Sequence, residues 1–449
     1  MKEPNILIFI PHDLGDYLGC YGHDDVKSPN LDRMAENGVR FTNFFTTAPE
    51  CTASRASLFS GMYSHQNGLV GLSFMGWKLQ VPHFATILRE YGYATHLFGF
   101  QHESEKPKDL GYDFLHSQDD MHTPAVCDSA IDFIRKQGAG EKPWLAHVGF
   151  HSVHRPWYRE TTFKPEDINL PSYLPDLPEI RNDYTYFYQS IMNMDVQVGR
   201  VLDELEKTGL EENTIVVFTT DHGSPFPGAK ATFYDPGVRV PLIVQHKNKL
   251  PEGSVVGQLI SNIDFMPTML EYCRYRVPQN IEGHSFLSLL TGEGDYQKRD
   301  EVFGAMYYDV SYDPMYYVRT ERYKYIRSYG IDPKEVAGAD PQALAVFKGS
   351  RWVRFDDYDV LTSQTWKTIE KDYGNSKPPK EELYDLKADP EEQHNLALNP
   401  ASENVLRAMR ETLAAMMKKT AAPLPDSHIA PNSVQLEVGG NYRKKLEIN

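Results

Sequence analysis

The sequence predicts an α/β protein with a large, mixed but mostly parallel sheet flanked by helices, followed by a smaller C-terminal antiparallel sheet plus a helix. Three observations predict this fold class. Apolar runs at residues 5–10, 144–150 and 213–220 have the length and composition of strands buried on both faces. Helix-like segments separate such runs, and this alternation builds a parallel sheet. From Val302 onward, shorter tyrosine-rich segments are typical of an antiparallel sheet.

Length and charge limit the range of functions. A chain of 449 residues can bury a large core. We expect a large α/β domain over residues 1–300 and a C-terminal α+β subdomain over 301–449, with an insertion around 329–379. The net charge of −16 argues against a nucleic-acid partner and attracts no anion over long range. An anionic substrate would therefore need a positive pocket built locally.

The cysteines and the apolar runs bear on the compartment. Four scattered cysteines, without paired spacing, argue against a disulfide framework. No apolar run approaches the length that spans a membrane. The start, Met1-Lys2-Glu3-Pro4, leads straight into a strand without a visible signal peptide. These features predict a cytoplasmic protein, or a periplasmic or secreted one if a leader was removed, and leave the oligomeric state open.

The first elements of the chain bring polar residues to one edge of the sheet. The strand at 5–10 ends at a proline and is followed by His12-Asp13-Leu14-Gly15. Sites in α/β folds lie at the carboxyl ends of strands, although Asp13 alone could simply cap a turn. Residues 28–38 have the early proline and final glycine of a helix, and residues 41–45 alternate like a strand.

A cysteine follows at the predicted start of the next helix. Cys51 comes after Ala48-Pro49-Glu50 and before an apolar, helix-compatible run. The free N–H groups and positive dipole end of a helix N-terminus suit an anion. Arg55 lies one turn later and could direct its guanidinium fork at the same anion. The alternative from these residues alone is a small buried cysteine followed by a surface arginine.

The later strands end in polar residues as well. A helix at 84–92 and a strand at 93–99 precede Phe100-Gln101-His102. The run at 144–150 precedes His151 and His154, which could also be a structural loop pair. An amphipathic helix at 186–207 carries Asp195 as a framework acid. The run at 213–220 precedes Asp221 and His222, and further strands (305–308, 316–319, 323–327) and a helix at 402–418 complete the chain.

The pattern Cys51-x-Ala53-Ser54-Arg55, followed by Leu58-x-Ser60-Gly61, resembles the type I sulfatase signature of the alkaline phosphatase superfamily. The resemblance implies that a maturase converts Cys51 to formylglycine (3-oxoalanine), whose hydrate is the nucleophile, and that Arg55 supports it. The commonest form of the signature has proline where this chain has Ala53. That departure resembles bacterial sulfatases matured by radical enzymes.

The resemblance also implies a metal site and its catalytic neighbours. Sulfatases carry Asp-Asp-x-Gly after the first strand, whereas this chain has His12 before Asp13. The implied ligands of one divalent metal are His12, Asp13, Cys51, Asp221 and His222. Calcium is the usual sulfatase ion, and the two imidazoles leave manganese or zinc as alternatives.

The resemblance further assigns sulfate binding and proton transfer to His102, His154 and Lys230. The family lysine that precedes His102 is Phe100 here, so one cation is missing unless a residue such as Lys106 or Lys108 supplies it. Arg239 is expected to be a structural ion-pair partner.

Three segments are similar to N-sulfoglucosamine sulfohydrolases: Leu58-Phe59-Ser60-Gly61 with His65-Gln66-Asn67-Gly68, the stretch 150–155 (Phe-His-Ser-Val-His-Arg), and 221–227 (Asp-His-Gly-Ser-Pro-Phe-Pro). This similarity implies a sulfated sugar as substrate. Three alternatives remain: an arylsulfatase, a phosphonate or phosphate ester hydrolase of the same superfamily, and a non-catalytic anion-binding homologue. The insertion at 329–379 either lines the pocket mouth or covers the small sheet.

Overall fold

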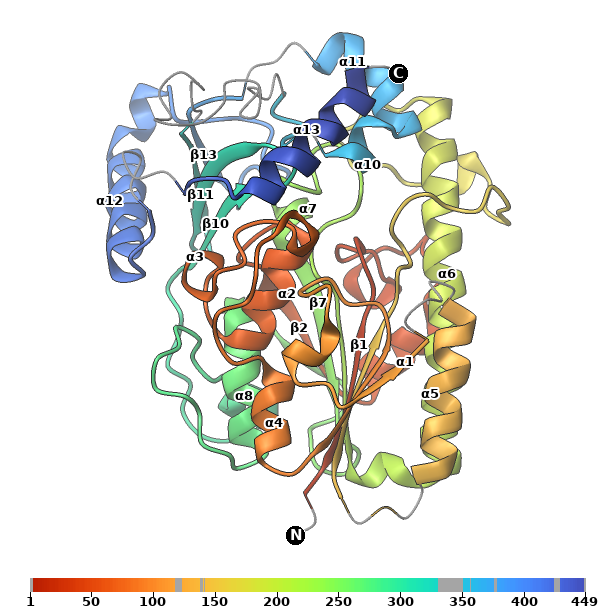
Figure 1. Cartoon of the computed structure of the whole chain (residues 1–449). Helices are drawn as coiled ribbons and strands as arrows, with labels where there is room; N and C mark the ends of the chain where they lie inside the picture. The colour runs from red at the N-terminus through yellow and green to blue at the C-terminus, as the bar shows by residue number, and fades with distance from the viewer. Residues whose placement is uncertain are drawn as a thin grey trace.

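The computed structural model describes residues 3–117, 123–137, 140, 142–329, 350–355, 357–374, 378–423 and 429–447. It contains a nine-stranded mixed sheet flanked by helices and a separate four-stranded antiparallel sheet (Figure 1). This arrangement confirms the predicted fold class. The strands of the large sheet are β1 (Asn5–Ile10), β2 (Val39–Phe45), β3 (Ala94–Gly99), β4 (Phe114–His116), β5 (Trp144–Gly149), β6 (Thr214–Thr219), β7 (Arg239–Gln245), β8 (Ser254–Val256) and β9 (Ile260–Ser261).

The order of strands places β1 near the centre of the large sheet. The order is β4-β3-β5-β1-β6-β7-β2-β8, with β9 also paired to β2. β1 runs parallel to both neighbours, and Ile8 lies opposite His147 of β5 and Val217 of β6. Only β7 is antiparallel to its neighbours, β6 and β2. The carboxyl ends of β3, β5, β1 and β6 therefore meet at one edge.

Helices cover both faces of this sheet (Figure 1). One face packs against α1 (Pro29–Glu36), α5 (Thr123–Gln137) and α6 (Pro178–Lys207), and the other against α2 (Cys51–Ser60), α4 (Phe84–Glu90) and α8 (Phe265–Tyr272). Leu7 and Phe9 point into the first core, and Ile6, Ile8 and Ile10 into the second. Burial on both faces explains why β1 is apolar throughout. The short helices are α3 (Ser64–Asn67), α7 (Asp235–Val238) and α9 (Leu287–Thr291).

The second sheet packs beside the first. Its strands are β10 (Val302–Tyr308), β11 (Tyr312–Arg319), β12 (Tyr323–Ser328) and β13 (Glu381–Asp385), in that order. One face carries α12 (Glu403–Lys419) through buried leucines and methionines. α10 (Tyr358–Leu361) and α11 (Gln364–Tyr373) come from the insertion, and α13 (Ser433–Glu447) crosses the top of the molecule (Figure 1). Within the described residues, no helix is both long and apolar enough to cross a membrane.

α6 starts earlier than its apolar pattern predicts, and it carries a buried framework acid. The helix begins at Pro178, eight residues before the predicted start, and its first turns bury the polar Asp183 together with Ile180 and Tyr184. A search for apolar periodicity misses a turn whose buried side chain is an acid. Asp195 is the framework acid that was predicted. It accepts hydrogen bonds from the backbone N–H of Leu31 at 2.9 Å and from the side chain of Asn30 at 2.8 Å.

Candidate active site

A cavity of about 260 Å³ opens at the carboxyl edge of the large sheet. Loops after β1, β3 and β5 and the start of α2 meet there with the β10–β11 connection and the insertion. The described lining residues are His12, Pro49, Glu50, Cys51, Leu72, Phe74, Met75, Phe100, His102, His151, His154, Lys230, Asp309, Val310, Asp357, Tyr358, Asp359 and Tyr442. The structure brings together all nine predicted site residues in and directly beneath this cavity.

Two carboxylates and two imidazoles form a buried cluster at the floor. Ligand atoms of His12, Asp13, Asp221 and His222 all lie within 4.8 Å of one another. His12 Nδ1 lies 2.5 Å from Asp13 Oδ1 and 3.4 Å from Asp221 Oδ2, and His222 Nε2 lies 3.3 Å from Asp13 Oδ1. Asp13 has φ +58°, a left-handed conformation that aspartate tolerates better than most residues. The backbone of Asp13 donates to Asp221 Oδ1 at 3.0 Å.

The electrostatics of this cluster fit a divalent cation. Burial alone would raise the pKa of Asp13, but Lys230 and the surrounding imidazoles outweigh it and hold the pKa well below its usual range. Burial lowers the pKa of His12 well below its usual value, so this ring is neutral. Two carboxylates and two imidazoles are a suitable donor set for a hard or borderline divalent metal.

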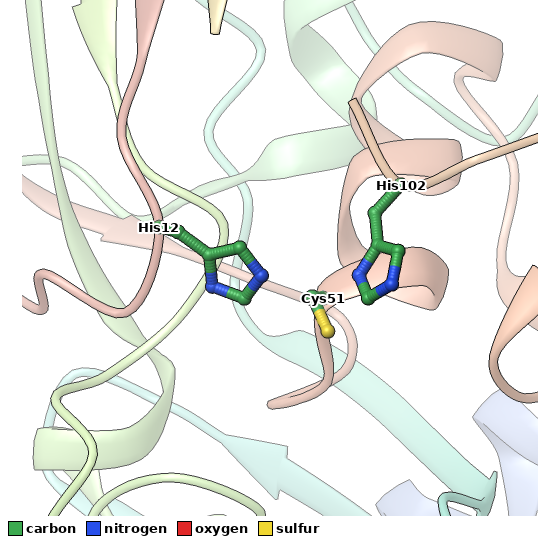
Figure 2. A group of neighbouring side chains, drawn as sticks. All are labelled: His12, Cys51 and His102. Carbon is green, nitrogen blue, oxygen red and sulfur yellow. The ribbon is translucent and has the colours of Figure 1, made fainter. Parts of the chain in front are cut away.

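Cys51 is the first residue of α2 and is buried beside this cluster. Figure 2 shows its sulfur converging with the rings of His12 and His102, and potential ligand atoms of these three residues lie within 4.8 Å of one another. The N–H groups expected to be free for an anion are occupied. The carboxylate of Glu50 accepts from the backbone of Thr52 at 2.8 Å and of Ala53 at 2.9 Å. The chain thus caps this helix with its own acid.

Arg55 is buried beneath the cavity and does not line it. Its Nε and Nη2 lie 3.1 and 3.0 Å from Asp221 Oδ2, and Nη2 donates to the carbonyl oxygen of Pro11 at 3.1 Å. The ring of Phe100 lies 5.4 Å from the guanidinium carbon. The guanidinium that was expected to bind an oxyanion at residue 51 therefore contacts Asp221 instead. The remaining Nη1 has no hydrogen-bond partner among the described residues.

Two cationic groups face the cavity. Lys230 Nζ donates to Asp13 Oδ2 at 2.8 Å and to Asp359 Oδ2 at 2.7 Å, and His154 Nε2 lies 2.9 Å from the same Asp359 oxygen. Burial would lower the pKa of His154, but Asp359 and Asp13 outweigh it and raise the pKa to about 9. Burial also opposes the charge of Lys230, but Asp13 and the carboxylates of Asp357 and Asp359 raise the pKa well above its usual value.

His102 is held through its backbone rather than through its ring. Its carbonyl oxygen accepts from Thr52 Oγ1 at 3.0 Å and from Ser73 Oγ at 2.8 Å, while its N–H donates to Glu103 at 2.8 Å. Ring atom Nδ1 is buried and has no hydrogen-bond partner among the described residues. Burial first, and then the charge of Arg55, lower the pKa of His102 to about 3. This imidazole is therefore neutral and has an unused nitrogen.

Neither Lys106 nor Lys108 supplies the missing cation. Lys106 and Lys108 flank or lie in a short 3₁₀ helix, η3 (Pro107–Leu110), and both are exposed rather than lining the cavity. Lys230 is the one lysine or arginine among the described lining residues. Arg239, expected to be structural, pairs with Asp16 at 2.9 Å.

Sequence reasoning missed several acids of the cavity. Asp357 and Asp359 come from the insertion, of which residues 357–359 line the cavity while α11 packs against α6. Asp309 comes from the connection after β10, and Tyr442 from α13. None of these residues belongs to a motif or follows a predicted strand of the large sheet. The described lining therefore contains four acids beside the two cationic groups Lys230 and His154.

One arginine joins the loops that carry His154 and Lys230. Arg155 donates to both oxygens of Asp183 on α6, at 2.9 and 2.8 Å, and to the carbonyl oxygen of Pro225 at 3.1 Å. Its guanidinium carbon lies 3.9 Å from the Trp157 ring centre and 4.8 Å from that of Phe226. Asp183 also accepts from the backbone and hydroxyl of Thr365, in the insertion. Arg155 therefore connects three of the segments around the cavity.

Comparisons with known proteins place this geometry in context. Residues 4–275 match the family profile described as "Sulfatase", and residues 228–344 match one described as "N-sulphoglucosamine sulphohydrolase, C-terminal". An "Ulvan-active sulfatase" of Formosa agariphila is 28% identical over 95% of this chain and 77% of its own length. The human "N-sulphoglucosamine sulphohydrolase" is 26% identical over 94% of this chain and 91% of its own.

Solved structures share the fold. A structure described as a complex with its substrate D-glucosamine-2-N,6-O-disulfate superposes with a TM-score of 0.72 and 21% identity, covering 95% of this chain and 99% of the other. A phosphonate monoester hydrolase of Agrobacterium radiobacter gives a TM-score of 0.70 and 20% identity, covering 93% and 96%. At these identities, the likeness concerns the fold alone.

Proposed function

Because the chain belongs to the sulfatase family of sulfuric ester hydrolases, we propose that it hydrolyses a sulfate ester or N-sulfonate on a sulfated sugar, after a maturase has converted Cys51 to formylglycine. The names of its relatives support a sugar substrate, since they include ulvan-active sulfatases and an N-sulphoglucosamine sulphohydrolase. One observation carries the proposal: Cys51 begins a helix beside the buried cluster of Asp13 and Asp221, with Lys230 and His154 facing it.

The buried cluster is the proposed metal site. His12, Asp13, Asp221 and His222 would hold one divalent cation together with the side chain of residue 51, and calcium suits the carboxylates while manganese or zinc suits the imidazoles. Bound there, the cation supplies a Lewis acid, and the hydrated aldehyde supplies an oxygen nucleophile. Arg55 keeps Asp221 in place through two contacts to one oxygen.

Lys230 and His154 would bind the sulfate oxygens. Both are held against Asp359 and Asp13, so they are positioned before a substrate arrives. The two groups differ as acids. With its pKa near 9, His154 carries a proton at neutral pH and can release it to a leaving oxygen or nitrogen from Nε2. Lys230 holds its proton more tightly and serves as a fixed charge.

His102 is the proposed proton acceptor. It is neutral, and its Nδ1 is buried without a hydrogen-bond partner among the described residues. Its ring converges on residue 51 (Figure 2). A proton leaving the side chain of residue 51, as sulfate departs, can therefore pass to Nδ1.

Mass spectrometry of the Cys51 peptide tests the proposal, using protein made with an anaerobic-type maturase because of Ala53. Conversion of the thiol to the aldehyde lowers the peptide mass by about 18 Da. Converted protein should release sulfate from a sulfated sugar, and Cys51→Ala should be inactive with an unchanged circular dichroism spectrum. Converted protein that cleaves an aryl phosphonate but no sulfate would favour the hydrolase alternative. If no maturase converts Cys51 in the folded protein, the result would favour an anion-binding homologue.

A further inference from the structure

The cavity contains more acids than an anion-binding site needs. Glu50, Asp309, Asp357 and Asp359 line it, against the two cationic groups Lys230 and His154. Glu50 is accounted for, because its carboxylate caps α2. The other three come from the β10–β11 connection and the insertion. Asp359 helps to position Lys230 and His154, but no step of the proposed chemistry uses any of the three as an acid, a base or a metal ligand. We call Asp309, Asp357 and Asp359 the acidic rim.

Among the described residues, none donates a hydrogen bond to the carboxylate of Asp309. Its side chain is 7% exposed and lines the cavity. A largely buried carboxylate that no protein group donates to depends on hydrogen bonds from whatever fills the cavity. Burial and the nearby carboxylates of Asp357 and Glu50 also raise the pKa of Asp309 well above its usual value. A ligand that donates hydrogen bonds would relieve this situation.

The rest of the rim lies directly beside the proposed sulfate position. Asp359 contacts both Lys230 and His154, and Asp357 lies 3.8 Å from Lys230. Groups on the substrate next to the sulfated atom must therefore meet these carboxylates. Aromatic rings of Phe74, Tyr358 and Tyr442 line the same cavity and offer surfaces for the C–H faces of a sugar ring.

We propose that the acidic rim determines substrate specificity by accepting hydrogen bonds from hydroxyl or amino groups that flank the sulfated atom, and by rejecting a second anionic group there. The proposal rests on the proposed sulfatase function. A second sulfate or a carboxylate would face three acids without an added cation, and such like-charge contact is strongly disfavoured. The preferred substrate class is a singly sulfated sugar with free hydroxyl or amino groups beside the sulfate.

Competition between related sugars tests this specificity. The probes are D-glucosamine 2-N-sulfate, D-glucosamine 6-sulfate and the 2-N,6-O-disulfate, because the disulfate is the doubly charged partner of either single sulfate. We expect kcat/KM to be at least about tenfold higher for the single sulfate that is cleaved than for the disulfate. In assays run at a pH above the raised pKa of Asp309, where its carboxylate is charged, Asp309→Asn should cut this ratio about tenfold, since it removes one like charge and leaves an amide of the same shape.

A matched control removes a charge elsewhere. Glu321→Gln lies on the turn between β11 and β12, with a side chain 61% exposed, and should leave the ratio unchanged. An unchanged ratio in Asp309→Asn would overturn the proposal, as would a wild-type preference for the disulfate, which would indicate a second cation among the rim carboxylates. Cleavage of 4-nitrophenyl sulfate separates the two proposals. If the protein cleaves this ester but Asp309→Asn leaves the ratio unchanged, the proposed sulfatase function stands and the rim proposal fails. If the protein cleaves no sulfate at all, both proposals fail.

Discussion

Replacing Arg155 by alanine removes the group that connects the loops around the cavity. The guanidinium gives two charge-assisted hydrogen bonds to Asp183 and one to the carbonyl of Pro225, and it stacks between two aromatic rings. Asp183 is fully buried, so the substitution leaves a carboxylate without its counter-charge. Breaking a buried pair in this way costs about 3–5 kcal/mol.

Two sets of contacts in the structure determine where in this range the cost of Arg155→Ala falls. Asp183 keeps two hydrogen bonds from Thr365, which lowers the cost of the unpaired carboxylate. Loss of the aromatic contacts adds about 1 kcal/mol. We therefore expect Arg155→Ala to reduce the free energy of unfolding by about 4 kcal/mol. Adding Asp183→Asn should recover about half of the loss, because the buried charge is then gone.

Urea denaturation followed by far-ultraviolet circular dichroism measures this effect without relying on the fluorescence of Trp157, which contacts the substituted side chain. Arg159→Ala is the matched control: Arg159 is exposed and stacks on Tyr186 at 4.9 Å, so the loss should stay below about 1 kcal/mol. A loss in Arg155→Ala no larger than in this control would refute the reasoning. Sulfate release should also fall in Arg155→Ala, because the backbone of Arg155 accepts a hydrogen bond from His154.

Two other predictions concern the metal and pH. Removal of divalent cations by a chelator should abolish sulfate release and lower the melting temperature, because Asp13 and Asp221 would lose the proposed counter-ion. Calcium or manganese should restore the activity and, at a hundredfold excess over Kd, raise the free energy of unfolding by about 3 kcal/mol. Full activity in protein shown to be metal-free by elemental analysis would contradict this. Burial would raise the pKa of Asp16, but Arg239 outweighs it and lowers the pKa to about 2. The resulting stabilisation of about 2 kcal/mol is present above pH 4 and is lost as the pH falls toward 2. The difference in urea midpoint between wild type and Asp16→Asn should therefore disappear over that interval. A constant difference would contradict the lowered pKa of Asp16.

Much of the floor of the site could be predicted because its residues directly follow buried strands. Asp13 after β1 and Asp221 after β6 are fixed by apolar runs that end abruptly in polar residues, and parallel strands must bring such ends to one edge. The cap on α2 could also have been found. Glu50 stands at the N-cap position before a helix-compatible run, and an acid there satisfies the N–H groups that were assigned to an external anion.

The roof of the site could not be predicted in the same way. Asp359 lies 129 residues from Lys230 along the chain, so no local pattern relates the two side chains. The same is true of Tyr442, whose helix follows the last predicted element. Contacts of this kind depend on how separate elements pack, and that information is spread over the whole core rather than held in a motif.

Arg155 gives a physical reason for two motifs that the sequence analysis identified only by their resemblance to a family. The segments Phe-His-Ser-Val-His-Arg and Ser-Pro-Phe-Pro are far apart in the chain, yet Arg155 of the first bonds the carbonyl of Pro225 and stacks on Phe226 of the second. The two motifs are therefore one packed unit that sets the separation between His154 and Lys230. Since the described lining holds two cationic groups against four acids, a divalent cation at the proposed metal site would double the positive charge available to a sulfate. A fixed pair of cations and a removable one would make substrate affinity follow metal occupancy.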